Sequence, residues 1–316
     1  MHRIDVHHHI VPPKYVEAVG AARVFRQSGR ANPPSAGWTL QKSLEQMDAN
    51  GIATALTSLS APGTWFGDVE QGRRLSRECN EYAAQLARDY PGRFGTLVSL
   101  PLPDVEGSLR EIEYAFDVLK ADGVVLMTSY DNRWLGEKAY APVFKELDRR
   151  RAVVLFHPTV APCCECLMTD IPDALVEFMF ETVRTVVSML YSGSFTRYSK
   201  MRFIVPHCGS AVPLLKARIS GLSNWNRQIA ERLPNGPLHE LKKLYYDTAL
   251  SARPECFGPL LELVTAKNIV LGTDYPWGGM TVADTIAGVV RQGFSVEELR
   301  SIERDNALAL FPKLKR

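Results

Sequence analysis

The sequence of 316 residues predicts an α/β fold in which eight parallel strands, each followed by a helix, close into a (β/α)8 TIM barrel. Short apolar runs alternate with longer amphipathic stretches over nearly the whole chain. The apolar runs are β-branched and continuous, as is typical of parallel strands buried on both faces. Barrels of this class commonly reach this length as one domain. Because the sequence shows no repeat, charged tail or clear linker, we expect a single domain over residues 1–316.

The elements follow in order along the chain. Strands are predicted at 3–9 (RIDVHHH), 53–59 (ATALTSL), 94–100 (FGTLVSL), 123–128 (GVVLMT), 152–157 (AVVLFH), 202–207 (RFIVPH), 244–249 (LYYDTA) and 268–273 (NIVLGT). Amphipathic patterns predict helices over 69–89, 107–120, 141–150, 173–192, 211–231 and 255–265. Stretches rich in Gly, Pro and Ser at 29–37 and 61–67 are expected to be loops. A doubly wound open sheet is the alternative, but no glycine-rich phosphate fingerprint follows the first strand.

Composition and charge exclude several classes of partner. The chain is 46% hydrophobic and 23% charged, which is ordinary for a globular protein with a large core. A net charge of +2 argues for neither nucleic acid nor a membrane surface as partner. No apolar run approaches the ~18 residues of a membrane span, and the first strand begins almost at Met1, so no signal peptide is expected. Six irregularly spaced cysteines indicate reduced thiols in the cytoplasm rather than a disulfide framework.

Four histidines and one aspartate stand at the ends of predicted strands. His7 and His9 end the first strand, His157 the fifth and His207 the sixth, and Asp274 closes the eighth in "GTDYPW". The carboxyl ends of the strands form the active-site face of such barrels, so these side chains are expected to converge. Neutral imidazoles with a carboxylate are the ligands expected for Zn²⁺ or a similar divalent ion.

The "HHH" run near Met1 looks like a purification tag, but it lies inside an apolar strand. His7 and His9 are two residues apart and therefore point to the same side, into the barrel mouth, whereas His8 points toward the helices. His2 and His239 lack a strand-end position and are expected to be surface or loop residues. A lone strand-end histidine is more often a structural group, but the shared placement of the whole set favours a metal site.

Aromatic residues follow four of the strands, on loops at the expected mouth: Trp38, Trp65, Phe66, Trp134, Tyr275 and Trp277. Flat rings at a mouth can sandwich a flat substrate. Trp38, Trp65 and Trp277 are our candidates for substrate contact. Loop aromatics also cap barrels or fill subunit interfaces, and this alternative stays open. The segment "PCCECL" after the fifth strand matches no zinc spacing and is expected to be a mouth-lining loop.

The ordered set of "DVHHH", His157, His207 and Asp274 resembles the metal-dependent amidohydrolase superfamily. Within it, "HCGSAVPLLKAR" and "GTDYPW" are most similar to the branch named for aminocarboxymuconate semialdehyde decarboxylase. The stretch "FMFETVRTVVSMLYSG" looks most like 6-methylsalicylate decarboxylases. The resemblance implies that His7, His9, His157 and Asp274 bind the metal and that His207 is an acid/base group beside it.

The resemblance has further implications for the site. Binuclear members carry a bridging lysine or glutamate at the end of strand four, where this chain has Met127 and Thr128, so one metal ion is implied. Arg218 stands where the family's arginine reaches across a dimer interface to bind a substrate carboxylate, although an ordinary surface arginine is the alternative. A second carboxylate-binding arginine of the family has only Lys42 as a poor substitute here. That departure leaves the exact substrate open.

Three functions compete at this point. The favoured one is a non-oxidative decarboxylase of a hydroxyaryl carboxylic acid of the 6-methylsalicylate type, with the ring carbon protonated by Asp274 or by a water that His207 assists. The alternative is a hydrolase or hydratase acting on a lactone, amide or enol acid at the same metal. A barrel that binds without turnover is disfavoured by the intact His207.

The expected cofactor and partners follow from the favoured function. We expect one divalent ion, Zn²⁺ first, with Mn²⁺ and Co²⁺ as alternatives. The other partners expected are a small aromatic carboxylate and a second copy of the chain in a homodimer.

Overall fold

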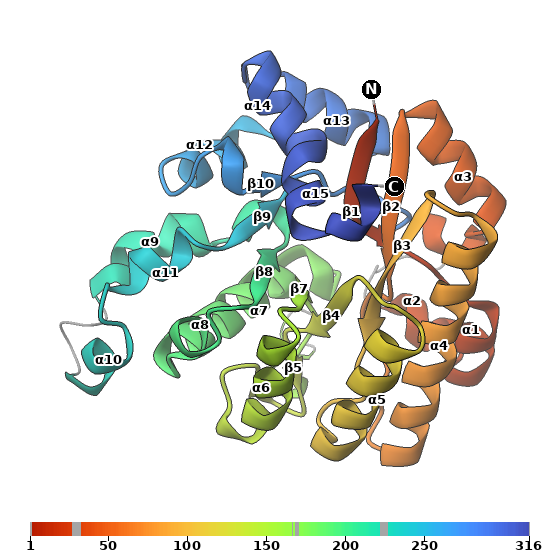
Figure 1. Cartoon of the computed structure of the whole chain (residues 1–316), viewed down its shortest axis with the longest axis horizontal. Helices are drawn as coiled ribbons and strands as arrows, with labels where there is room; N and C mark the ends of the chain where they lie inside the picture. Colours follow the sequence, from red (N-terminus) through yellow and green to blue (C-terminus); the bar gives the residue numbers. More distant parts are fainter. Residues whose placement is uncertain (1, 27–32, 166, 168–170, 222–226, 316) are drawn as a thin grey trace.

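The computed structural model describes residues 2–26, 33–165, 167, 171–221 and 227–315. Within these residues, eight parallel strands form one sheet in the order β1-β2-β3-β4-β7-β8-β9-β10 (Figure 1). Their bounds are β1 Arg3–His9, β2 Ile52–Ser58, β3 Phe94–Ser99, β4 Gly123–Met127, β7 Val153–His157, β8 Arg202–Val205, β9 Tyr245–Asp247 and β10 Ile269–Val270. Strand β7 is buried along its whole length, which explains why its sequence shows no alternation.

The sheet closes between its first strand and the segment that continues β10. The backbone N–H of Asp274 donates to the carbonyl of His7 at 2.8 Å, and the N–H of His9 donates to the carbonyl of Tyr275 at 2.7 Å. A parallel bridge joins His8 and Tyr275 in the same seam. The Asp5 carboxylate on β1 also accepts from the Thr273 hydroxyl at 2.6 Å. The predicted (β/α)8 barrel is therefore confirmed, and the doubly wound open sheet is excluded.

Helices surround the strands on the outside of the barrel (Figure 1). The first seven are α1 Pro13–Val19, α2 Ala21–Phe25, α3 Leu40–Ala49, α4 Val69–Asp89, α5 Val105–Asp117, α6 Ala141–Arg149 and α7 Asp173–Tyr191. The later ones are α8 Ser194–Arg197, α9 Val212–Ser220, α10 Arg227–Arg232, α11 Pro237–Leu241, α12 Pro254–Leu261, α13 Val282–Val290, α14 Val296–Arg300 and α15 Asn306–Leu310. A small hairpin, β5 Ser129–Tyr130 with β6 Arg133–Trp134, follows β4.

The helix predictions match the structure to different degrees. Helix α4 matches the predicted range of 69–89, and its N-cap Asp68 accepts a hydrogen bond from the N–H of Gln71. The single helix predicted over 211–231 is wrong, because α9 ends at Ser220 and α10 begins at Arg227, with 222–226 outside the described residues. The loop predicted at 29–37 contains a 3-10 turn at Pro34–Gly37, and its residues up to 32 lie outside the description.

Two sequence-level expectations can be checked away from the site. All five cysteines in the described part of the chain are free thiols, and Cys166 lies outside it. Among the described helices, none combines the length and apolar character that a membrane span requires.

Candidate metal centre

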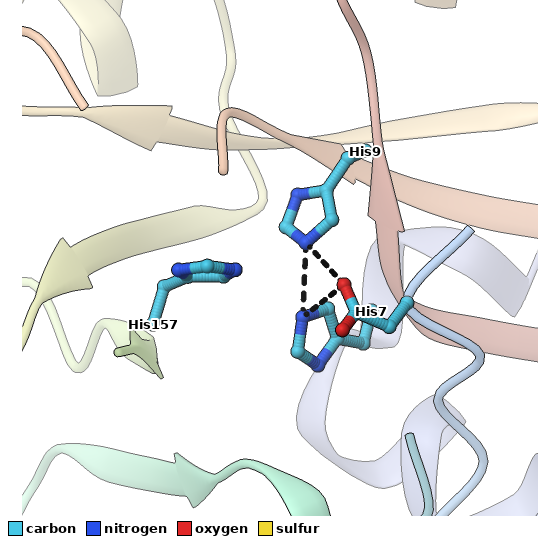
Figure 2. A group of neighbouring side chains, drawn as sticks. His7, His9 and His157 are labelled. Atoms are coloured by element: carbon cyan, nitrogen blue, oxygen red, sulfur yellow. Dashed lines mark hydrogen bonds and ion pairs between the residues drawn. The ribbon is translucent and has the colours of Figure 1, made fainter. Parts of the chain in front are cut away.

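Three imidazoles and one carboxylate converge at the carboxyl end of the barrel. His7 and His9 come from β1, His157 ends β7, and Asp274 lies just after β10. One ligand atom from each residue lies within 4.8 Å of the others, and all four residues are buried. Figure 2 shows the rings of His7, His9 and His157 facing a common centre from two sides of the barrel. The predicted convergence at the strand ends is therefore present.

Hydrogen bonds at the back of each ring orient its front toward this centre. Nδ1 of His7 lies 2.8 Å from a carboxylate oxygen of Asp247, and Nδ1 of His157 lies 2.8 Å from the carbonyl oxygen of Pro158. Nδ1 of His9 lies 3.2 Å from the carbonyl oxygen of Ser58. Because these oxygens accept hydrogen bonds, they assign the ring proton to Nδ1 and leave the Nε2 lone pair toward the centre. This is the arrangement that metal-ligating histidines adopt.

The electrostatics of the group favour a bound cation. Burial lowers the pKa of His9, and burial together with the neighbouring His9 and His7 lowers the pKa of His157 well below its usual value, so both rings are neutral donors. Burial also acts to lower the pKa of His7, but the charges of Asp247 and Asp274 outweigh it and raise that pKa to about 9. The imidazoles hold the pKa of Asp274 well below its usual range against the opposing effect of burial.

Atoms that lack partners test whether a metal ion fits. The Nε2 atoms of His7 and His9 lie only 3.0 Å apart, and Nε2 of His9 lies 3.0 Å from Oδ1 of Asp274 (Figure 2). Oδ1 of Asp274 is buried and accepts no hydrogen bond from the described residues. Lone pairs brought this close in a buried site repel one another unless a proton, such as the one that His7 holds below about pH 9, or a metal ion lies between them. Three imidazole nitrogens and one carboxylate oxygen match the donors of a first-row divalent ion.

His207 lies beside this group rather than in it. It stands in a 3-10 turn, His207–Gly209, just after β8, so the strand predicted over 202–207 ends at Val205. Its Nε2 is 3.3 Å from Oδ2 of Asp274. Its Nδ1 is buried and has no hydrogen-bond partner among the described residues. One ring nitrogen therefore has no partner among the described residues, and the residue itself lines the cavity next to the metal group.

A cavity of about 400 Å³ adjoins the metal group. Its polar lining consists of Ser60, His157, His207, Ser251 and Asp274. Its remaining wall is formed by apolar side chains, by glycines and by Trp277, whose indole Nε1 is buried without a partner among the described residues: Ala61, Pro172, Ala174, Leu175, Phe178, Met179, Leu250, Trp277, Gly278 and Gly279. No lysine or arginine is among these lining residues of the described chain. The volume is at the lower end of the range for small-molecule sites, which suits a ligand of one ring.

The three tryptophans predicted to contact substrate lie in three different places. Trp277 lines the cavity at the metal group. Trp65 lines a separate cavity of about 370 Å³ and donates its Nε1–H to Asp131 at 2.8 Å. Trp38 lines a third hollow beside Phe25 and packs edge-on against Tyr82. Only Trp277 of the three reaches the cavity that the metal group adjoins.

Other predicted residues can be placed as clearly. His8 points away from the metal group, with Nε2 2.6 Å from the Ser43 hydroxyl on α3, as the strand alternation predicts. Met127 at the end of β4 is buried and offers no bridging ligand. Arg218 is exposed on α9 and does not line the cavity. Helix α9 itself lies at the left of Figure 1, among helices that extend away from the barrel.

Two buried carboxylates near the site escaped the sequence analysis. Asp247 ends β9 in "YYDT" and contacts His7, and Asp5 on β1 accepts from the backbone N–H of His7 at 3.0 Å. The signal that identified Asp274, an acidic residue at a strand end, applies equally to Asp247. The cavity wall from Leu175 and Phe178 had no such signal, because a helical pattern does not say which turn reaches the barrel mouth.

The chain is similar to known proteins along nearly its whole length. Residues 4–313 match the model of the amidohydrolase family. The chain is 35% identical over 338 residues to decarboxylase yanB of Aspergillus niger, covering 99% of this chain and 88% of that protein. It is 33% identical over 330 residues to 6-methylsalicylic acid decarboxylase acuB of Aspergillus aculeatus, covering 99% and 97%.

A solved structure shares the fold at lower identity. It is 5-carboxyvanillate decarboxylase of Novosphingobium aromaticivorans, complexed with manganese and 4-hydroxy-3-methoxy-5-nitrobenzoic acid. It superposes with a TM-score of 0.87 at 20% identity, over 98% of this chain and 96% of that one.

Proposed function

This chain belongs to the amidohydrolase family and is a carboxy-lyase within it, and from that premise we propose that it removes CO₂ from a hydroxyaryl carboxylic acid of the 6-methylsalicylate type. One observation carries the proposal. The buried group of three imidazoles and Asp274 adjoins a cavity of one-ring size with a largely apolar wall. The relatives at 33–35% identity named above include a 6-methylsalicylic acid decarboxylase, which supports this substrate class.

The cofactor of this proposal is one divalent ion held by His7, His9, His157 and Asp274. When bound, such an ion supplies a Lewis acid for a phenolate or carboxylate oxygen of the substrate. Zn²⁺ is the first expectation from the donor set, and Mn²⁺, which the structural relative contains, and Co²⁺ also accept these donors.

The apolar wall prepares the substrate for loss of CO₂. Phe178 and Trp277 present aromatic rings, and Leu175 adds aliphatic surface, so a flat ring can be held without polar contacts along its face. A carboxylate in such a pocket is stripped of water, which favours its departure as neutral CO₂.

His207 is the proton carrier in this proposal. It lines the cavity, its buried Nδ1 has no partner among the described residues, and its Nε2 contacts Asp274. Asp274 is ionised at neutral pH because its pKa lies well below the usual range, so it serves as ligand and as partner of His207 rather than as the resting acid. A proton passes from His207 to the ring carbon that bears the carboxylate. The bond to CO₂ then breaks, its electrons restore the aromatic ring, and His207 regains a proton from water.

Among the described residues that line the cavity, no lysine or arginine can pair with the substrate carboxylate. We therefore also propose that the protein acts as a homodimer in which Arg218 of one copy serves the cavity of the other. The exposed position of Arg218 on α9 supports this, since its side chain is open to a second molecule.

The reaction can be tested with a panel of hydroxybenzoates that includes 6-methylsalicylate. The metal-loaded protein is incubated with each acid in ¹⁸O-labelled water, and the products are read by mass spectrometry. We expect loss of about 44 mass units, one CO₂, without ¹⁸O in the aromatic product. A product that gains labelled water and keeps its carboxylate would identify a hydrolase or hydratase and contradict the proposal.

A further inference from the structure

Asp247 connects the metal ligands to the proposed proton carrier. Its side chain is fully buried at the end of β9. One oxygen, Oδ2, faces Nδ1 of His7 at 2.8 Å. The other, Oδ1, accepts from the backbone N–H of His207 at 2.9 Å and from that of Ala249 at 3.0 Å. We propose that Asp247 is a positioning residue that sets the tautomer of His7 for metal binding and at the same time holds the backbone of His207.

The contact with His7 decides which ring nitrogen is free. A carboxylate can only accept, so Nδ1 of His7 must carry the proton that it donates. In the neutral ring this leaves Nε2 as a lone pair, and Nε2 is the atom that faces His9 and Asp274. Without an acceptor at Nδ1, the proton of a neutral imidazole can occupy either nitrogen. The Nε2 lone pair that binds the metal is then free in only a fraction of the molecules.

The contact with His207 holds a backbone that is unfavourable on its own. His207 has a φ of 57°, Cys208 one of 53° and Ser210 one of 55°, all in the left-handed region that side chains other than glycine rarely adopt. Such conformations persist only where the surroundings determine them, and they cluster at functional sites. The N–H of His207 is also buried and needs an acceptor, which Oδ1 of Asp247 provides. The direction of the His207 ring therefore depends on Asp247.

The contacts with His7 and with the backbone of His207 use different oxygens of Asp247. One substitution can therefore change the first contact and keep the second. In Asp247→Asn, the amide oxygen keeps facing the two backbone N–H groups, because the reverse orientation would leave both without an acceptor. The amide NH₂ then faces His7, which must accept at Nδ1 and move its proton to Nε2. The variant thus removes the lone pair of one ligand while the backbone of His207 keeps its anchor.

The experiment measures metal affinity, so it rests on the metal site of the proposed function but not on the substrate. Zn²⁺ and Mn²⁺ binding to the full chain is measured by competition with a chelator at fixed pH. We expect Asp247→Asn to bind both ions at least about 10–100-fold more weakly than the wild type, the range known for lost partners of metal ligands. The far-UV circular dichroism of the metal-free variant should be unchanged. Affinity equal to that of the wild type would overturn the proposal.

A double-mutant cycle separates a specific effect from general damage. In a His7→Ala background, Asp247→Asn should cause no further loss of affinity, because its effect passes through His7. An equal loss with and without His7 would show a merely structural role and overturn the proposal.

The tautomer can also be read in the wild type, which keeps the proposal testable where the variant does not fold. We expect ¹H–¹⁵N spectra of the metal-free protein above the pKa of His7 to place the remaining proton on Nδ1, and a proton on Nε2 would contradict the proposal. Neither measurement depends on which acid is decarboxylated, so failure of the substrate assignment leaves the outcome readable.

Discussion

Gly272 lies so close to His7 that a Cβ added to the glycine would stand 2.8 Å from the Cβ of His7. The same atom would stand 3.0 Å from the Cβ of Asp247. A Cβ cannot rotate away as the end of a flexible side chain can, so one of the strands would have to move. The missing side chain of Gly272 is therefore what allows a metal ligand from β1 and its carboxylate partner from β9 to meet.

We predict that Gly272→Ala destabilises the protein and weakens metal binding together. Overpacking of a buried site typically costs about 1–3 kcal/mol in the free energy of unfolding, and here the displacement falls on His7 and Asp247. Thermal unfolding of the metal-free protein and chelator competition measure the two effects. Gly258→Ala in α12 is the matched control, because a Cβ there meets nothing within 4 Å. This prediction would be contradicted if the Gly272→Ala protein matched the Gly258→Ala protein in both thermal stability and metal affinity.

Elemental analysis should find one tightly bound divalent ion per chain. The prediction follows from the single group of converging donors in the described part of the chain and from Met127 at the place of a bridging ligand. His157→Ala should lower the bound metal to a small fraction, because it removes one of four donors. Two ions retained per chain after dialysis would show that the site is binuclear.

Metal affinity should rise with pH between about 7 and 9. The raised pKa of His7, about 9, means that the metal-free site holds a proton below that pH, and the ion must displace it. The apparent affinity should therefore increase about tenfold per pH unit and level off above about pH 9. His9 and His157 add nothing in this window, because the pKa of each is lowered. Isothermal titration in buffers of different ionisation enthalpy should detect about one proton released per ion at pH 7.5, and affinity that is flat over this range would refute the assignment.

His207→Ala should separate binding of the metal from turnover. The residue lies outside the group of converging donors, so the metal content should stay at the wild-type value. Turnover should fall about 10²–10⁴-fold, the usual loss for a removed general acid or base. His239→Ala, at an exposed site on α11, serves as the control and should leave both quantities unchanged. Loss of the metal together with activity would make His207 a ligand instead.

Much of the barrel could be predicted because its signals are local. Buried parallel strands are continuous apolar runs, and each of the eight predicted runs overlaps an observed strand. The strand ends also placed His157 and Asp274, because the carboxyl ends of all strands meet at one face of the barrel. The end of the last strand was harder to predict. β10 ends at Val270, and the segment after it closes the barrel through separate backbone hydrogen bonds rather than a regular strand pairing.

The wall of the site could not be predicted in the same way. Trp38 and Trp277 both follow strands as loop aromatics, yet only Trp277 reaches the cavity, because the path of a loop depends on packing far away in the sequence. Asp247 shows the reverse case, in which a usable signal was present at a strand end. Its role depends on a backbone N–H of His207, forty residues earlier, and backbone partners leave no mark in the sequence.

The least local of the predictions concerns assembly through Arg218. This side chain is exposed on α9, and the cavity of its own chain is lined without it, so we predict that it contacts substrate only across a dimer interface. Arg218→Ala should raise KM strongly with a smaller effect on kcat, because a charged two-point contact with the carboxylate is lost.

Mixing the Arg218→Ala and His207→Ala proteins should then restore activity in heterodimers. In the Arg218→Ala subunit of such a pair, His207 is intact and the missing arginine arrives from the other copy. An arginine that acts within its own chain cannot give this result, since each subunit would still lack one group. Lys216→Ala on the same helix is the control, because that side chain pairs with Glu262 at 2.6 Å and should leave KM unchanged. Full activity in a protein that stays monomeric on a sizing column, or a mixture no more active than its parts, would refute the shared site.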